Sequence, residues 1–190
     1  LRKVGELGGP QDIPALLDLL MKTKTGQEVD AAEQALSVIC AKGGDAGSAA
    51  GAVAARMAQA TPEQKGALLR VLSSMGGARA LESVRAAVGD TDGEVRAAAI
   101  RTLGEWKTAD AAPDLLALAK STTNPTERTL CLRSYLGLAS HPDITATQRL
   151  AMCRDAAPLA QKPGEKKLLL SALGNIQTAQ TGPRCHGTEE

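Results

Sequence analysis

The sequence predicts an all-α protein built from repeated helical hairpins, and three observations lead to this prediction. Apolar residues recur at helical spacing along most of the chain, and alanine and leucine, both strong helix formers, dominate them. Hydrophobic residues make up 43% of the chain, yet there is one Trp, one Tyr and no Phe, which favours thin layers of small side chains. Glycines that end predicted helices recur about every 28 to 37 residues, the length of a two-helix repeat.

The best-formed repeat lies at residues 91–104, a turn followed by one short helix. Residues at i, i+3 and i+4 spacing place an apolar stripe on one side of this helix, made of Val95, Ala98, Ala99, Thr102 and Leu103. The segment 78–88 has a similar stripe and precedes it directly. The two segments are therefore expected to form a helical hairpin.

The other helices follow from the same periodicity and from start and stop signals. Thr61-Pro62 and Asn124-Pro125 are typical of helix starts, and Gly43-Gly44 and Gly76-Gly77 are typical of helix ends. Residues 1–8 resemble the tail of a helix, so the chain is expected to begin inside a repeat. A solenoid is predicted over residues 1–176, with a flexible tail over 177–190. The remaining helices are predicted over 12–22, 27–42, 45–60, 62–75, 108–120, 126–139, 145–159 and 163–176.

Composition disfavours several classes of function. The formal net charge is +1, whereas duplex nucleic-acid binders usually carry a marked basic excess. The sequence has no apolar run of transmembrane length. Cysteines in apolar helical stretches, Cys40, Cys131 and Cys153, are interpreted as buried thiols. Cys185-His186 lacks the second cysteine of a haem-attachment motif, and no metal or catalytic motif occurs, so neither a cofactor nor enzymatic activity is expected.

The residues from Asp90 to Gly104, Asp-Thr-Asp-Gly-Glu-Val-Arg-Ala-Ala-Ala-Ile-Arg-Thr-Leu-Gly, resemble a HEAT repeat of the phycobilisome-lyase-like type. The resemblance implies a right-handed α-α superhelix, a HEAT-like solenoid of about five helical hairpins. It also implies that Asp90 and Arg96 tie successive layers by hydrogen bonds. The implied function is a non-enzymatic interaction, scaffold or spacer module that binds a protein or peptide through its concave face.

A broader resemblance extends over several segments of the chain. Residues 31–36, 101–106, 112–119, 132–136 and 165–174 are similar to HEAT regions of planctomycete and verrucomicrobial multidomain proteins. This implies a bacterial, periplasmic or exported parent in which other domains are fused to this one. Two alternative functions follow from the resemblances: an accessory region of a sugar-active protein of the 3-keto-disaccharide hydrolase type, or phycobilisome-lyase-like chromophore attachment to a partner.

Candidate binding residues come from the second helices of the hairpins. Arg70, Arg101 and Arg133 recur at intervals of 31 and 32, so they are expected to stack into a basic ladder. Such a ladder suits an acidic peptide, a carboxylated sugar or a phosphate-bearing partner. The alternative is a solvated helix flank offset by nearby glutamates. Trp106 follows a helix end and is expected to cap the layer from outside, where it could contact a partner.

A second basic register consists of Lys65, Arg96, Arg128 and Lys166.

Overall fold

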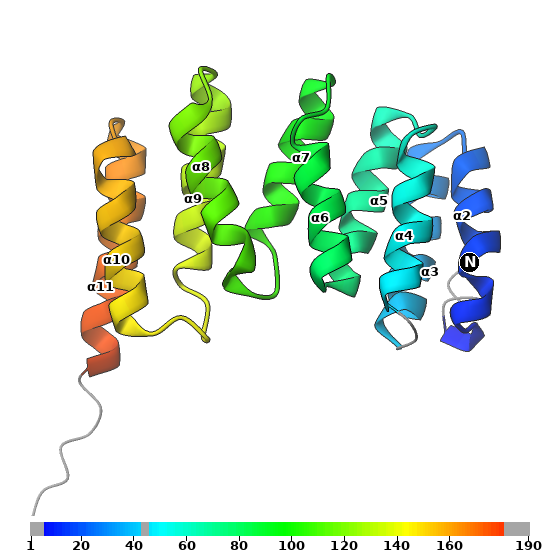
Figure 1. The fold of residues 1–190 in the computed structure, drawn as a ribbon, viewed down its shortest axis with the longest axis horizontal. Helices are drawn as coiled ribbons and strands as arrows, with labels where there is room; N and C mark the ends of the chain where they lie inside the picture. Colours follow the sequence, from blue (N-terminus) through cyan, green and yellow to red (C-terminus); the bar gives the residue numbers. More distant parts are fainter. Residues whose placement is uncertain (1–5, 43–45, 181–190) are drawn as a thin grey trace, which may run out of the picture. The chain divides into compact units, whose positions relative to one another are not determined.

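The computed structural model describes residues 6–42 and 46–180, and every regular element in these ranges is a helix. The chain divides into two compact units, unit 1 over Leu1–Lys107 and unit 2 over Thr108–Glu190. Each unit is a stack of antiparallel helical hairpins (Figure 1). The predicted all-α, HEAT-like solenoid class is thereby confirmed.

Unit 1 contains three hairpins in its described part. A 3-10 helix, η1 (Pro10–Asp12), precedes the first of them. The hairpins pair α2 (Ile13–Lys22) with α3 (Gly26–Ala41), α4 (Ala46–Met57) with α5 (Pro62–Met75), and α6 (Ala78–Ala87) with α7 (Gly93–Gly104).

The helices of unit 1 form two layers. The first helices of the hairpins, α2, α4 and α6, pack side by side in sequence order, and the second helices, α3, α5 and α7, do the same (Figure 1). Because α5 lies between α3 and α7 and also packs on α4 and α6, it buries nearly its whole circumference. Its buried residues include Leu68, Leu69, Val71 and Leu72, which explains why its apolar stripe is broader than that of an edge helix.

Unit 2 contains two hairpins. The first pairs α8 (Ala112–Ser121) with α9 (Pro125–Leu138), after a 3-10 turn η2 (Ala109–Ala111). The second pairs α10 (Ala146–Ala156) with α11 (Pro163–Gln180), separated by η3 (Ala157–Leu159). The helix α9 packs against α8, α10 and α11 and buries Cys131, Leu132, Tyr135 and Leu136.

The helix ends follow the predicted signals. Thr61 and Asn124 accept hydrogen bonds from the first-turn amides of α5 and α9, with proline as the first residue of each helix. Gly76 and Gly77 have φ values of 68° and 83°, a region that favours glycine, so they can end α5 and start α6 without strain. The proposed stop at Gly43-Gly44 lies outside the described residues.

One helix boundary differs from the prediction. The contacts group the chain into two compact units divided after Lys107, and the single solenoid over 1–176 stays a prediction. The helix α11 extends to Gln180, so residues 177–180 of the predicted tail are helical. The rest of that tail, residues 181–190, lies outside the described part of the chain, together with Cys185 and His186.

Candidate functional site

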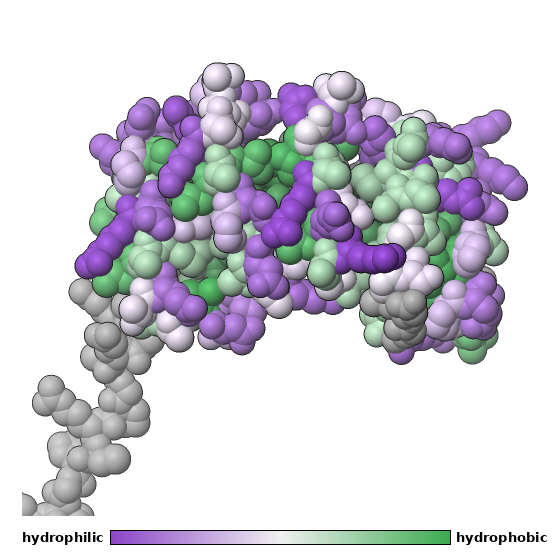
Figure 2. Space-filling view, in the orientation of Figure 1, coloured by the Kyte–Doolittle hydropathy of each residue, from purple (hydrophilic) through white to green (hydrophobic). Residues whose placement is uncertain are grey.

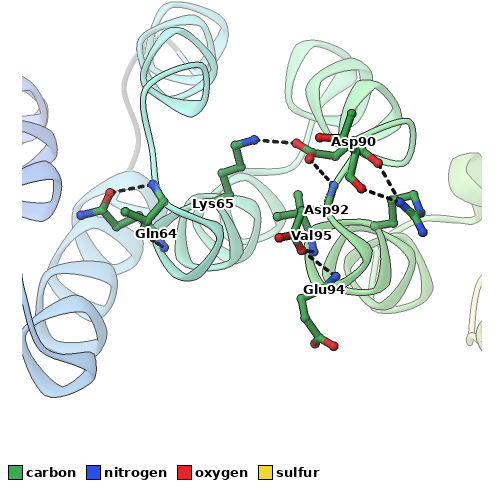
Figure 3. A network of polar contacts seen from close by, with 9 residues as sticks. Gln64, Lys65, Asp90, Asp92, Glu94 and Val95 are labelled. Carbon is green, nitrogen blue, oxygen red and sulfur yellow. Dashed lines mark hydrogen bonds and ion pairs between the residues drawn. The ribbon is translucent and has the colours of Figure 1, made fainter.

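The turn before α7 carries a polar network around Asp90, one of the predicted residues (Figure 3). Asp92 caps α7 by accepting hydrogen bonds from the amides of Glu94 at 2.8 Å and Val95 at 3.2 Å. The Asp90 carboxylate accepts a hydrogen bond from the Asp92 amide at 2.9 Å and one from Lys65 Nζ at 2.6 Å. The hydrogen bond from Lys65, followed by that from the Asp92 amide, lowers the pKa of Asp90 below its ordinary value.

Two hydrogen bonds of Arg96 lie within its own hairpin, and its role as a layer tie stays a prediction. Its Nη1 donates to the backbone carbonyls of Asp90 at 3.0 Å and Thr91 at 3.1 Å, so these bonds close the turn of its own hairpin. The link from Asp90 to the preceding hairpin is made by Lys65, on α5. Lys65 is the fourth residue of α5 and Arg96 the fourth residue of α7, so the same register supplies both cations.

Gln64 makes a second polar link between hairpins, which sequence reasoning missed. Its Oε1 accepts a hydrogen bond from the Thr61 amide at 3.0 Å, and its Nε2 donates to the carbonyls of Leu20 at 3.2 Å and Met21 at 3.4 Å. These carbonyls lie in the last turn of α2, beyond the reach of the regular helical hydrogen bonds, and that of Leu20 also accepts from the Thr23 amide at 3.2 Å. The signal in the sequence was the capping box formed by Thr61 and Gln64, whose buried amide can also reach a neighbouring helix.

Glu165 makes the equivalent link in unit 2. It is only 2% exposed, and it accepts hydrogen bonds from Thr129 Oγ1 at 2.7 Å and from the amides of Gln161 and Lys162, both at 3.0 Å. Burial by itself raises the pKa of Glu165, but these hydrogen bonds and Lys162 outweigh it, so the pKa lies below its ordinary value. The bond from Thr129, on α9, ties the two hairpins of unit 2 together.

The three arginines of the predicted ladder have different environments. Arg70 forms a bidentate ion pair with Glu33 on α3, with Nε–Oε1 and Nη2–Oε2 distances of 2.9 and 2.5 Å. Hydrogen bonding to Glu33 raises the pKa of Arg70 above its ordinary value. The guanidinium that was expected to face a ligand therefore already has a carboxylate partner.

Arg101, on α7, and Arg133, on α9, are exposed and have no hydrogen bond or ion pair to a side chain in the described residues. For Arg101 the reason lies in the preceding second helix, α5. Glu33 lies eight residues after the N-cap of α3. The equivalent residue of α5, eight residues after its N-cap, is Leu69. In unit 1 the sequence therefore supplies an acidic partner for Arg70 but an apolar neighbour at the position that would face Arg101.

Trp106 does not cap the layer from outside. It is 3% exposed and forms part of the core, although it follows the end of α7. Its amide donates to the carbonyl of Leu103 at 3.3 Å, which forms a turn directly after the helix. A buried ring offers no surface to a ligand, and Trp106 is therefore removed from the candidate contacts.

A groove lies between α4 and α6 on the first-helix side of unit 1. It has a volume of about 400 Å³ and opens to solvent. Figure 2 shows weakly apolar residues over the upper part of α4 with hydrophilic residues beside them over α6. The lining includes Met57 and several alanines, together with Glu82, Ser83 and the Lys65–Asp90 ion pair. The groove therefore combines small apolar walls with one exposed carboxylate.

The described residues contain no group of three or more His, Cys, Asp or Glu side chains that could hold a metal ion. Cys40, Cys131 and Cys153 are free thiols, and burial raises the pKa of each, to about 12 for Cys131. Thiols with such pKa values remain protonated at neutral pH, which is the behaviour of core residues. Among the described helices, none combines the length and apolarity needed to cross a membrane.

The fold and these contacts define an α-solenoid whose layers are joined by polar bonds near the starts of the second helices. A family model for HEAT repeats matches residues 51–135, from α4 to α9. This segment is therefore similar to HEAT repeats. A search of curated proteins and a search of solved structures gave no match, and the resemblance to planctomycete multidomain proteins stays a prediction.

Proposed function

We propose that this chain is a non-enzymatic interaction and scaffold module, and that a partner protein binds the face formed by the second helices. HEAT repeats generally mediate protein interactions and scaffolding, and solenoids of this kind present an extended, preformed surface. A preformed surface loses little conformational entropy on binding, so moderate contacts suffice for affinity.

The observation that carries this proposal is the difference between Arg70 and Arg101. Both lie on second helices in unit 1, but Glu33 holds Arg70 while Arg101 projects from α7 without an ion-pair partner in the described residues. An exposed arginine on a helix held in place by packing on α5 and α6 is a suitable contact for a carboxylate. Arg133 is the corresponding candidate in unit 2.

The test is affinity enrichment of partners from a bacterial lysate with three forms of the chain. Arg101→Glu reverses a charge on the second-helix face, and Glu82→Lys reverses one in the α4–α6 groove. Proteins enriched by the unaltered chain should be lost with Arg101→Glu and retained with Glu82→Lys. Circular dichroism should show that both variants keep their helicity.

The opposite pattern, loss with Glu82→Lys and retention with Arg101→Glu, would assign binding to the groove and contradict the proposed face. If no protein is enriched over uncoated beads, the interaction function itself loses its support. The sugar-active and chromophore-attachment alternatives stay predictions, and carbohydrate binding or bilin-dependent absorbance of the purified chain would test them.

A further inference from the structure

The groove between α4 and α6 lies on the first-helix side of unit 1, and neither Arg101 nor Arg133 lines it. Its walls are mainly apolar, because alanines line both sides and Met57 lies at the end of α4. Its volume of about 400 Å³ lies in the range of pockets that hold small molecules. The groove therefore has the size and the surface for a short carbon chain.

The uncommitted polar groups of the groove are hydrogen-bond acceptors. The Glu82 carboxylate is exposed and has no hydrogen bond or ion pair within the described part of the chain. The Ser83 hydroxyl donates to the Arg79 carbonyl at 3.0 Å, so its oxygen retains only acceptor capacity. A ligand that makes hydrogen bonds in the groove must therefore supply the donors.

The cation among the described lining residues, Lys65, is already paired. Its Nζ binds Asp90 Oδ2 at 2.6 Å, and only 21% and 15% of the two side chains are exposed (Figure 3). Two carboxylates, Glu82 and Asp90, and one ammonium give the lining a formal charge of −1. Because Lys65 and Asp90 neutralise each other, Glu82 carries the remaining charge, which favours a cationic ligand.

Two arginines flank Glu82 along α6 without lining the groove, Arg79 and Arg85. Arg79 Nη1 lies beside Gly51, 3.8 Å from the place of a Cβ there, one turn before the first lining residue of α4, Ala54. Neither arginine therefore occupies the space between the apolar walls.

We propose that the groove between α4 and α6 binds a small aliphatic amine, with its ammonium group at Glu82 and its carbon chain along Met57 and the alanines. The ammonium supplies the donors that the groove lacks, and the chain covers methyl groups that otherwise face water. The site goes beyond the proposed interaction function, because it adds a small ligand on the opposite layer of helices.

The probe is n-pentylamine hydrochloride, which is protonated at neutral pH. Its binding is followed by the Met57 ε-methyl resonance in a ¹H–¹³C spectrum of the full chain, assigned by its loss in Met57→Leu. Pentylamine should shift this resonance saturably. n-Pentanol lacks the charge and methylammonium chloride lacks the chain, so each should bind about fivefold more weakly or worse at matched ionic strength. No saturable shift, or equal affinity for pentanol, would overturn the proposal.

A capped glycyl-lysyl-glycine peptide distinguishes a protein side chain from a free amine. The lysine has the same ammonium group on a carbon chain, but the peptide also brings polar amides that the apolar walls cannot satisfy. We expect the peptide to bind more weakly than pentylamine. Tighter binding of the peptide would contradict a free amine as the ligand.

Glu82→Gln removes the charge at nearly constant size. It should weaken pentylamine binding about fivefold, as the loss of a partly exposed ion pair would. Glu63→Gln, at an exposed residue of α5 outside the lining, is the matched control and should leave the affinity unchanged. Equal weakening in both variants would show a general charge effect and refute the site.

Ala86→Leu fills the groove without changing its charge and should abolish the saturable shift. Ala86 is exposed, so a larger side chain can be accommodated, and circular dichroism checks the fold. Ala58→Leu replaces it if Ala86→Leu does not fold. Ala55→Leu, at an exposed residue of α4 outside the lining, should bind as the native chain does. Unchanged pentylamine affinity in a folded groove-filling variant would contradict occupancy of the groove.

The probe is a defined amine, so its result depends neither on Arg101 nor on any protein from a lysate. The proposed second-helix face and this groove can therefore fail separately.

Discussion

At the residue scale, Leu103 represents the apolar positions that the repeat pattern predicted. It lies on α7 and is fully buried. We expect Leu103→Ala to lower the free energy of unfolding by about 2–5 kcal/mol, because a large side chain is removed from a packed layer and leaves a cavity. Urea unfolding measures this loss. A change of less than about half a kcal/mol, typical of surface substitutions, would contradict the packing of α7.

The cysteines provide a second test at this scale. Because burial raises the pKa of Cys131 to about 12, its thiolate population at pH 8 is very small. We expect its alkylation by iodoacetamide in the folded chain to be on the order of a hundredfold slower than in urea. Mass spectrometry of Cys185→Ser, which limits labelling to the three described thiols, measures the rates. Equal rates in folded and unfolded chains would contradict the burial of Cys131.

At the element scale, polar bonds at the starts of the second helices hold neighbouring hairpins in register. Gln64 joins α5 to α2, Lys65 and Asp90 join α5 to the turn before α7, and Thr129 and Glu165 join α9 to α11. Apolar contacts have no preferred direction, whereas these bonds have fixed partners. We infer that they set the register of the layers while alanine and leucine packing provides most of the stability.

The contribution of Glu165 to the free energy of unfolding can be measured through its dependence on pH. Its pKa is lower in the folded state, so its stabilising contribution is complete above the ordinary glutamate pKa of about 4.3 and is lost as pH falls through the folded-state value. We expect Glu165→Gln to be less stable than the native chain at pH 7 and nearly as stable at pH 3. Urea unfolding at pH 7, 5 and 3 tests this. A stability difference that stays constant over this range would contradict an ionised Glu165.

At the scale of the whole molecule, stability should be local, because each helix packs on its own hairpin partner and on the adjacent hairpins. We expect Leu132→Ala, in unit 2, to increase amide hydrogen exchange in α8–α11 more than in α2–α7. Leu68→Ala is the matched variant in unit 1 and should give the reverse pattern. Exchange that rises equally in both units after either substitution would show that the chain unfolds as one cooperative body.

Local signals determined much of what could be predicted. Asn124-Pro125 and Thr61-Pro62 mark helix starts because their side chains and proline geometry act within one turn. Trp106 was placed wrongly because no local signal applies to it. Its position after a helix end does not indicate the direction that the chain takes next. Arg70 was taken as open because its partner, Glu33, is 37 residues away in sequence.

By itself, the sequence determined that this protein is a stack of helical hairpins, because helical periodicity and end signals act over a few residues and repeat along the chain. Only the tertiary structure decided which cations have partners. Lys65 pairs with Asp90 and Arg70 pairs with Glu33 across layers, whereas Arg101 has no ion-pair partner among the described residues. Ion pairing depends on which side chains meet after the layers pack, and residues distant in sequence decide that.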